Sequence, residues 1–458
     1  MIYLKAIYIV IVLSIIVTNA EPLFSQQTLT LDQTLRMAIE RNPDIRFAEK
    51  SIVQAENSLS TARSNALPSL SLVGNYQRGW ELPEFVFSPP AGFPGANGEI
   101  RVRTGVENTI TGGLVFQQPI YTGGAVRAGI GIANDAVKIS QHSYDSVEHQ
   151  TIQNVYSAFY GVLLAQSLMD VAERAVENAL VNFDQVERRY EQGAASRFEL
   201  LRADVQLATI KPALTESRHR YEVAIEHLKD LLGMEKYERI SVSGSFQPRA
   251  KTMIDADIEE LIDRAYMHRP EYQMQQLQQD INRKNIRIAR SEFLPRVVFS
   301  SAVQWQALRD DLDIGYDDFI RFSNSEISVQ IPLFNGFGSR ARFQEARAEL
   351  QKSEIQEKNI RNLIATEIRA IYNELVQTYE VLQSQERIIA QADEGLRLAN
   401  LLYEEGAATL LEVIDAQLAV TQASTSYFQS IYNFNTASIK LERAIGVLEI
   451  ESIIEGYE

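Results

Sequence analysis

The chain contains no cysteine and only five histidines among its 458 residues. Without cysteine, disulfide bonds cannot stabilise the fold, and lipidation of an N-terminal cysteine is impossible. The histidines are scattered and form no HExxH motif. His142 and His149 lie seven residues apart on one helical face, which favours a solvated surface over a metal-ligand pair. GxSxG, phosphate-loop and dinucleotide-binding motifs are also missing, so the sequence predicts no enzyme activity and no cofactor.

Basic residues are in deficit, with 44 Lys and Arg against 60 Asp and Glu, and the net charge is −16. Phosphate binding requires clustered basic side chains, so we expect no nucleic-acid partner. After Ala20 we find no apolar run that approaches the roughly 18 residues of a membrane-spanning helix. If the mature chain crosses a membrane, we therefore expect strands in a closed barrel.

Residues 1–20 begin with one Lys, continue with an apolar run from Ala6 to about Val17 and end in small residues. This order is typical of a secretory signal peptide cleaved after Ala20. The alternative is an uncleaved anchor helix, but the apolar core is short for a membrane span. We therefore expect an exported protein whose mature net charge is −17, because the leader contains one Lys and no acid.

The rest of the chain is an internal duplication. "YEQGAASRFELLRADVQL" at Tyr190–Leu207 returns as "YEEGAATLLEVIDAQLAV" at Tyr403–Val420, 213 residues later. Leu31–Ile45 matches Ile258–Tyr272 at an offset of 227. The difference of 14 residues is an insertion in the first copy between Pro68 and Pro119, in a Pro/Gly-rich segment that predicts a loop. We expect a first repeat over 21–233, a linker over 234–255, a second repeat over 256–446 and a tail over 447–458.

Each repeat contains very long helical patterns. Residues from Gly124 to about Tyr190 and from Ser339 to about Tyr403 contain no proline, and a final helix is expected from about Leu410 to Ile445. Such lengths exceed those of ordinary globular helices and indicate a coiled coil or a helical tube. A soluble coiled-coil rod would explain these helices equally well.

Between the helices the pattern changes to alternation. Strands are expected at about 69–80 and 108–118 in the first repeat, and at about 296–306 and 324–332 in the second. Each has one apolar face and one face rich in Ser, Thr, Gln and Asn, at a length that suits a tilted membrane strand. Both tryptophans, Trp80 and Trp305, lie at loop ends of strands, as expected for an aromatic belt at the membrane interface.

A periplasmic β-sandwich would also alternate, but the small hydroxyl and amide groups of the polar faces suit a wet lumen. Four strands cannot close a barrel, and open edges are not tolerated in lipid. The strands therefore predict an oligomer in which each chain contributes four strands. Three chains would give twelve strands, and counting alone leaves two or four chains open.

The chain resembles the outer-membrane efflux family, the TolC-like outer-membrane factors. The resemblance is carried by "LPSLSL", "QPIYTGGAVRAGI" and "IPLFNGFGSRARFQEARAEL", by the two Tyr-x-x-Gly turns and by the duplicated order of elements, from about Leu29 to Gly446. The strand-to-helix turns in these segments are marked by Pro119, Gly123, Gly124, Pro332, Gly336 and Gly338.

The resemblance implies an α+β membrane protein. Its duplicated helical hairpins would form a periplasmic α-barrel, and four transmembrane strands per chain would join a shared 12-stranded β-barrel in a homotrimer within the lipid of the outer membrane. It further implies a periplasmic adaptor, an inner-membrane transporter reached through that adaptor, and outward conduction without chemistry. An equatorial belt is implied as well, for which the segment near Ser241–Asp255 and the tail are candidates. A structural periplasmic scaffold or adaptor without a pore remains the alternative.

The family resemblance places the two doubled turns at the periplasmic entrance. Gly193 and Gly406 suit the reversal of a helix, and Ser196 and Thr409, each with a Glu three residues later, form candidate capping boxes. The small surface expected to dock an adaptor comprises Tyr190, Gly193, Ala194, Ala195, Gly406, Ala407 and Ala408.

A gate is the sharper hypothesis for these turns. Tyr403, Glu412 and Asp415 match family positions that line a closed aperture, where rings of acids would favour cations. Some family members have an arginine two residues after the turn glycine, but this chain has Ala408. A substitute ion pair is therefore expected from Arg202, which aligns with Asp415, or from Arg197; Glu199 is the first-copy counterpart of Glu412.

Overall fold

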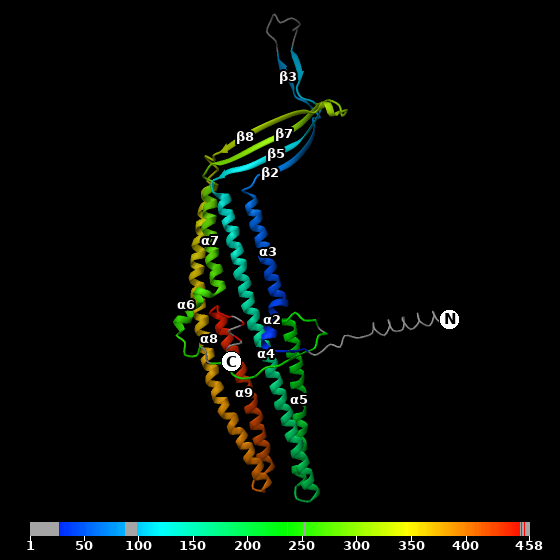
Figure 1. Ribbon diagram of the computed structural model, residues 1–458, viewed down its shortest axis with the longest axis vertical. Helices are drawn as coiled ribbons and strands as arrows, with labels where there is room; N and C mark the ends of the chain where they lie inside the picture. The colour runs from blue at the N-terminus through cyan, green and yellow to red at the C-terminus, as the bar shows by residue number, and fades with distance from the viewer. Residues whose placement is uncertain are drawn as a thin grey trace, which may run out of the picture. The chain divides into compact units, whose positions relative to one another are not determined.

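The computed structural model describes residues 27–87, 99–235, 237–250, 253–448, 450 and 453, and the expected signal peptide lies outside them. The chain divides into two compact units (Figure 1). The helical unit comprises the described residues of Met1–Ser51, Gln141–Met274 and Lys358–Glu458. The strand unit comprises Ile52–Ser140 and Gln275–Glu357, apart from the undescribed residues 88–98.

The helices occur as four pairs of equal length. The first copy has α2 (Leu31–Arg41), α3 (Pro43–Ser64), α4 (Ala125–Glu191) and α5 (Arg197–Leu231), and the second has α6 (Ile258–His268), α7 (Pro270–Ser291), α8 (Gly338–Glu404) and α9 (Leu410–Ala444). The pairs have 11, 22, 67 and 35 residues. The duplication read from sequence motifs is thus also a duplication of helix lengths.

Buried side chains of the helical unit form one hydrophobic cluster for each copy. The two clusters use equivalent positions: Leu35, Ala38, Val155, Leu228 and Leu232 in the first, and Ile262, Ala265, Ile368, Leu441 and Ile445 in the second. These pairs keep the offsets of 227 and 213, so the repeated motifs flank a repeated core. The tail contributes Leu448, Ile450 and Ile453 to the first cluster.

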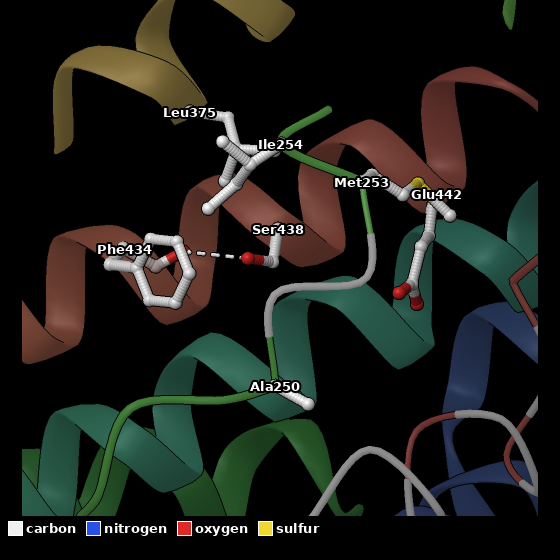
Figure 2. A pocket seen from close by; sticks show the side chains of 7 residues that line it. All are labelled: Ala250, Met253, Ile254, Leu375, Phe434, Ser438 and Glu442. Atoms are coloured by element: carbon white, nitrogen blue, oxygen red, sulfur yellow. Dashed lines mark hydrogen bonds between the residues drawn. The ribbon is translucent and has the colours of Figure 1, made fainter. Parts of the chain in front are cut away.

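The linker contains a strand that the sequence analysis did not predict. β1 (Gln27–Leu29) pairs in parallel with β6 (Ile240–Val242). Further along, the linker is attached to α9: Arg249 Nη1 lies 2.7 Å from Glu442 Oε1, and the Arg249 backbone N–H donates to Asn435 Oδ1 at 2.9 Å. Figure 2 shows Glu442 and Ser438 of α9 beside Ala250 and Met253 of this segment.

The strand unit contains a four-stranded antiparallel sheet in the order β2-β5-β7-β8. Its strands are β2 (Ser69–Arg78), β5 (Asn108–Thr122), β7 (Arg296–Arg309) and β8 (Ile320–Gln330). β5 and β7 are longer than the alternating patterns indicated, and β8 begins and ends earlier. A β-bulge between Pro119 and Tyr121 lets β5 continue past its proline.

The register places side chains of one kind opposite each other. Leu72 pairs with Leu114, which pairs with Val303 on the next strand, whereas Asn75 pairs with Thr111 and Thr111 with Gln306. Since alternate residues face opposite sides, the sheet has one apolar and one polar face over most of its length. The start of β8 breaks this pattern, because Ile320 and Phe322 share parity with Glu326.

Two expectations from the sequence were wrong. The inserted segment was expected to be a loop, but β3 (Glu84–Phe87) and β4 (Ile100–Arg103) form an antiparallel pair in it, because Phe85 and Phe87 alternate with Glu84 and Val86. We also expected no apolar run of helix-spanning length after Ala20. Among the described residues α4 contains one such window, more than half of which is buried, as in the core helix of a folded unit.

Candidate functional site

The two hairpin turns have the same backbone structure. Gly193 and Gly406 adopt left-handed φ angles of 77° and 78°. In the first turn, the N–H groups of Gly193 and Ala194 donate to the carbonyls of Tyr190 and Arg189; in the second, those of Gly406 and Ala407 donate to Tyr403 and Leu402. This is the two-bond Schellman pattern that ends a helix with glycine. The predicted glycine caps are confirmed at both turns.

Capping boxes begin the returning helices α5 and α9. Ser196 Oγ accepts from the Glu199 N–H at 3.2 Å, and Glu199 Oε2 accepts from the Ser196 N–H at 2.7 Å. Glu412 Oε2 accepts from the Thr409 N–H at 2.6 Å and from the Thr409 hydroxyl at 2.9 Å. These bonds stabilise the carboxylate and lower the pKa of Glu412. Both glutamates are therefore engaged in helix caps.

The two hairpins of one chain contact each other near the turns. Val186, Ala203 and Leu410 are buried together, and Tyr403 packs against this group. The guanidinium of Arg189 lies 5.1 Å from the centre of the Tyr403 ring, a cation–π contact between α4 and α8. The sequence analysis assigned a role to Tyr403 but missed Arg189. Its signal was an asymmetry of the repeat, since Leu402 occupies the equivalent position.

The expected ion pair does not form within one chain. Asp415 is exposed and Arg202 is half-buried, and neither Arg202 nor Arg197 lies within ion-pair distance of Asp415 in the described structure. The reason is positional: Arg197 and Arg202 are on α5 and Asp415 is on α9, and the hairpins contact through apolar groups instead. Asp415 is left as the exposed acid near the second turn.

The small residues expected to dock a partner are mostly accessible. Tyr190, Ala194 and Ala407 are exposed, and Ala195 and Ala408 are half-buried. Each turn therefore presents a small, largely apolar surface next to its glycine. The structure places this surface at the ends of the helical hairpins (Figure 1).

The strand-to-helix turns differ between the copies. Gly123 and Gly124 have φ of 62° and 87°, and Gly336 has φ of 65°. Gly338 was expected to be the other turn glycine, but Phe337 carries the second left-handed conformation, with φ of 65°, and Gly338 begins α8. The reason is alignment, because Phe337 rather than Gly338 is the equivalent of Gly124.

The turn prolines and the tryptophans flank the sheet. Pro119 lies at the bulge of β5, and Pro332 follows β8. Trp80 follows β2 and is 82% exposed, with the Arg78 guanidinium 4.5 Å from its ring centre. Trp305 is in β7, has the parity of the apolar face and is 40% exposed. Both rings are accessible to the surroundings of the sheet.

The described residues include no group of three or more His, Asp or Glu arranged to hold a metal ion. His142 Nδ1 instead lies 3.3 Å from Asp145 Oδ2 on the same helix. The arrangement of this chain is therefore one of surfaces, caps and packed helices.

The comparisons with known proteins agree over most of the chain. The sequence model described as "Outer membrane efflux protein" matches residues 34–234 and 261–447. Outer membrane protein TolC of Escherichia coli (strain K12) is 20% identical, over 93% of this chain and 84% of TolC. Nodulation protein T of Rhizobium leguminosarum bv. trifolii is 21% identical, over 86% and 81%. A membrane protein from Pseudomonas aeruginosa has the same fold, with a TM-score of 0.74 at 18% identity over 91% and 93%.

Proposed function

The chain belongs to the outer membrane efflux protein family, and from this premise we propose that it is the channel-tunnel of a tripartite efflux or type I secretion system. It is an outer-membrane protein with a periplasmic extension, related to efflux and secretion channels. Substrate passes through it passively, from a periplasmic adaptor and an inner-membrane transporter to the exterior. The observation that carries the proposal is the four-stranded sheet with two open edges, joined to duplicated long hairpins.

The sheet edges support a closed oligomer. β2 and β8 are the edge strands, and the alternating antiparallel order makes them run in opposite directions. A second copy can therefore pair its β2 with β8 antiparallel, and the sheet continues around a ring. Unpaired edges are not stable in lipid, so the ring must close. We propose a homotrimer with a barrel of about twelve strands, whose apolar face contacts lipid and whose polar face lines the lumen.

The hairpins support a tunnel that narrows at the turns. Helices α4 and α8 have 67 residues each, which at 1.5 Å per residue gives about 100 Å of helix. In the proposed trimer, three copies of each turn surround the entrance, and the exposed Asp415 carboxylates form a ring that favours cations. Arg202 and Arg197 have no ion-pair partner among the described residues of their own chain, so an ion pair with Asp415 would be formed between chains.

The exposed surface of the turns supports adaptor docking. Ala194, Ala407 and Tyr190 present small and apolar groups at the hairpin ends, where a partner hairpin can approach the backbone closely. Partners of this kind would connect the channel to the inner-membrane transporter, which supplies the energy and most of the substrate selectivity.

Reconstitution tests this function against the alternative of a structural periplasmic scaffold. The purified protein should require detergent, cross-link as a trimer and give discrete ion conductance in planar bilayers. A protein that is extracted without detergent and gives no conductance would be a scaffold. Crosslinking in cells followed by identification of the co-purified adaptor and transporter then assigns the export system.

A further inference from the structure

The turn that joins β8 to α8 exposes large apolar side chains. Leu333, Phe334 and Phe337 are 93%, 75% and 67% exposed. The rings of Phe334 and Phe337 form an edge-to-face pair whose centres are 5.3 Å apart. Leaving three such groups in water is unfavourable, so their exposure indicates a surface that is covered in the functional assembly.

The polar residues of the same turn are bound on another side. Ser339 Oγ donates to Glu292 Oε2 at 2.7 Å, and the Arg342 guanidinium binds both oxygens of Glu292 at 2.6–2.8 Å. Asn335 is hydrogen-bonded to Ser339. The turn is therefore two-sided: one set of side chains fixes it to the end of α7, and Leu333, Phe334 and Phe337 take no part in this network.

The exposed group continues the apolar face of β8. Ile327, Val329 and Ile331 are 64%, 58% and 55% exposed and alternate with Glu326, Ser328 and Gln330. Leu333 has the same parity two residues beyond Ile331. A surface that contacts lipid along the strand therefore extends into the turn, which is the level of the membrane–water boundary for a strand that ends there.

Backbone strain accompanies this exposure. Phe337 has φ of 65°, a conformation disfavoured for a bulky residue, whereas the first copy has Gly124 at the equivalent position with φ of 87°. Gly124 would do the same backbone work at Phe337 without strain. A bulky aromatic group held in this conformation suggests that the ring itself has a use.

We propose that this turn is a membrane-interface anchor, in which Phe334 and Phe337 insert among the phospholipids of the leaflet facing the periplasm. Aromatic side chains are favoured at this level because their rings are stable between headgroups and acyl chains. The proposal rests on the channel function above, since it requires the sheet to span the membrane. Leu333 extends the lipid-facing stripe of β8 to the pair, and one such anchor occurs in each chain.

Brominated lipids test this anchor, because bromine quenches tryptophan fluorescence only at short range. In full-length protein carrying Trp80→Phe and Trp305→Phe, a single tryptophan is introduced as Phe334→Trp or, independently, as Leu333→Trp. Each variant is reconstituted in vesicles of phosphatidylethanolamine with or without brominated acyl chains. Leu72→Trp on the apolar face of β2 reports the barrel, and Leu363→Trp, on an exposed part of α8 in the helical unit, is the control outside the membrane.

The anchor predicts that Phe334→Trp and Leu333→Trp lose fluorescence to an extent similar to Leu72→Trp, while Leu363→Trp is unaffected. Quenching at Leu72→Trp without quenching at either turn position would overturn the anchor and indicate that a neighbouring copy covers the turn. Quenching at the turn but not at Leu72→Trp would instead contradict the membrane-spanning sheet. Absence of quenching at all of these positions would contradict both.

Discussion

The guanidinium of Arg189 lies 5.1 Å from the ring centre of Tyr403, and this contact joins the last turn of α4 to the last turn of α8. The two residues come from different copies of the repeat, and neither has its own type at the equivalent position, because Leu402 replaces the arginine and Tyr190 is exposed. The hairpins of one chain are therefore held together by a residue difference between the copies.

Removing this contact is expected to favour the open entrance. Arg189→Ala and Tyr403→Ala should each raise the open fraction about two- to fivefold per contact, since a cation–π pair at a partly exposed site contributes about 0.5–1 kcal/mol. Tyr403→Phe keeps the ring and should behave as the unaltered protein. Single-channel recording in planar bilayers measures the open fraction. Arg188→Ala, an exposed neighbour, is the matched control, and an open fraction that rises equally in Tyr403→Phe would contradict this contact as the cause.

The acids of the second turn are expected to differ in their effect on ion selectivity. Glu412 is bound to Thr409 in the helix cap, whereas Asp415 is exposed. Asp415→Asn should reduce cation preference, measured as a shift of the reversal potential in a salt gradient. Glu412→Gln should change it much less, because glutamine retains the cap and the carboxylate it replaces is already engaged.

Acid pH provides a second check on these two acids. The lowered pKa of Glu412 means that its contribution to stability is present above the unfolded pKa and is lost only as the pH falls through the lower folded value. The helix cap should therefore persist under mildly acidic conditions. Equal loss of selectivity in the two variants would contradict the assignment of Glu412 to the cap.

Local signals predicted the repeated parts of this structure well. The glycine caps and capping boxes follow from a few residues at fixed spacing, and they form as expected at Gly193, Ser196, Gly406 and Thr409. The alternating segments likewise contain the four strands of the sheet. Periodicity and capping are short-range properties, so one sequence is sufficient to recognise them.

Features that depend on distant partners were not predictable in this way. β6 has only three residues and becomes a strand because β1, more than 200 positions earlier, pairs with it. Arg189 meets Tyr403 through tertiary packing, and the expected pairing of Arg202 with Asp415 assumed that aligned positions face each other. Phe337 was overlooked because glycine is the usual residue at positive φ.

The two glycines of the first strand-to-helix turn are expected to differ in tolerance to alanine. A Cβ at Gly124 would meet nothing within 4 Å, so Gly124→Ala should lose only about 1–2 kcal/mol through its positive φ. A Cβ at Gly123 would lie 2.7 Å from the carbonyl oxygen of Ser291, so Gly123→Ala adds a clash with backbone. Thermal unfolding in detergent should therefore rank Gly123→Ala well below Gly124→Ala; the reverse order would contradict the close packing of this turn on α7.

The Arg249–Glu442 pair is expected to make the attachment of the linker to α9 depend on pH. Its side chains are 2% and 6% exposed, and burial raises the pKa of Glu442 while Arg249 partly opposes this shift. Arg249→Ala leaves a buried carboxylate without its partner and should lower the free energy of unfolding by about 3–5 kcal/mol at neutral pH.

Protonation removes the charge of Glu442, so acidification should reduce the penalty of Arg249→Ala. A carboxyl group with a raised folded pKa binds its proton more tightly in the folded state, and stability is therefore lost as the pH rises through the interval between the unfolded and folded values. Melting curves of the variant and the unaltered protein should converge toward acid pH and diverge toward neutral pH. Arg264→Ala, which breaks an exposed pair with Glu260, should cost at most about 1 kcal/mol and serves as the control. A penalty for Arg249→Ala that is independent of pH would contradict an ionised Glu442 as its source.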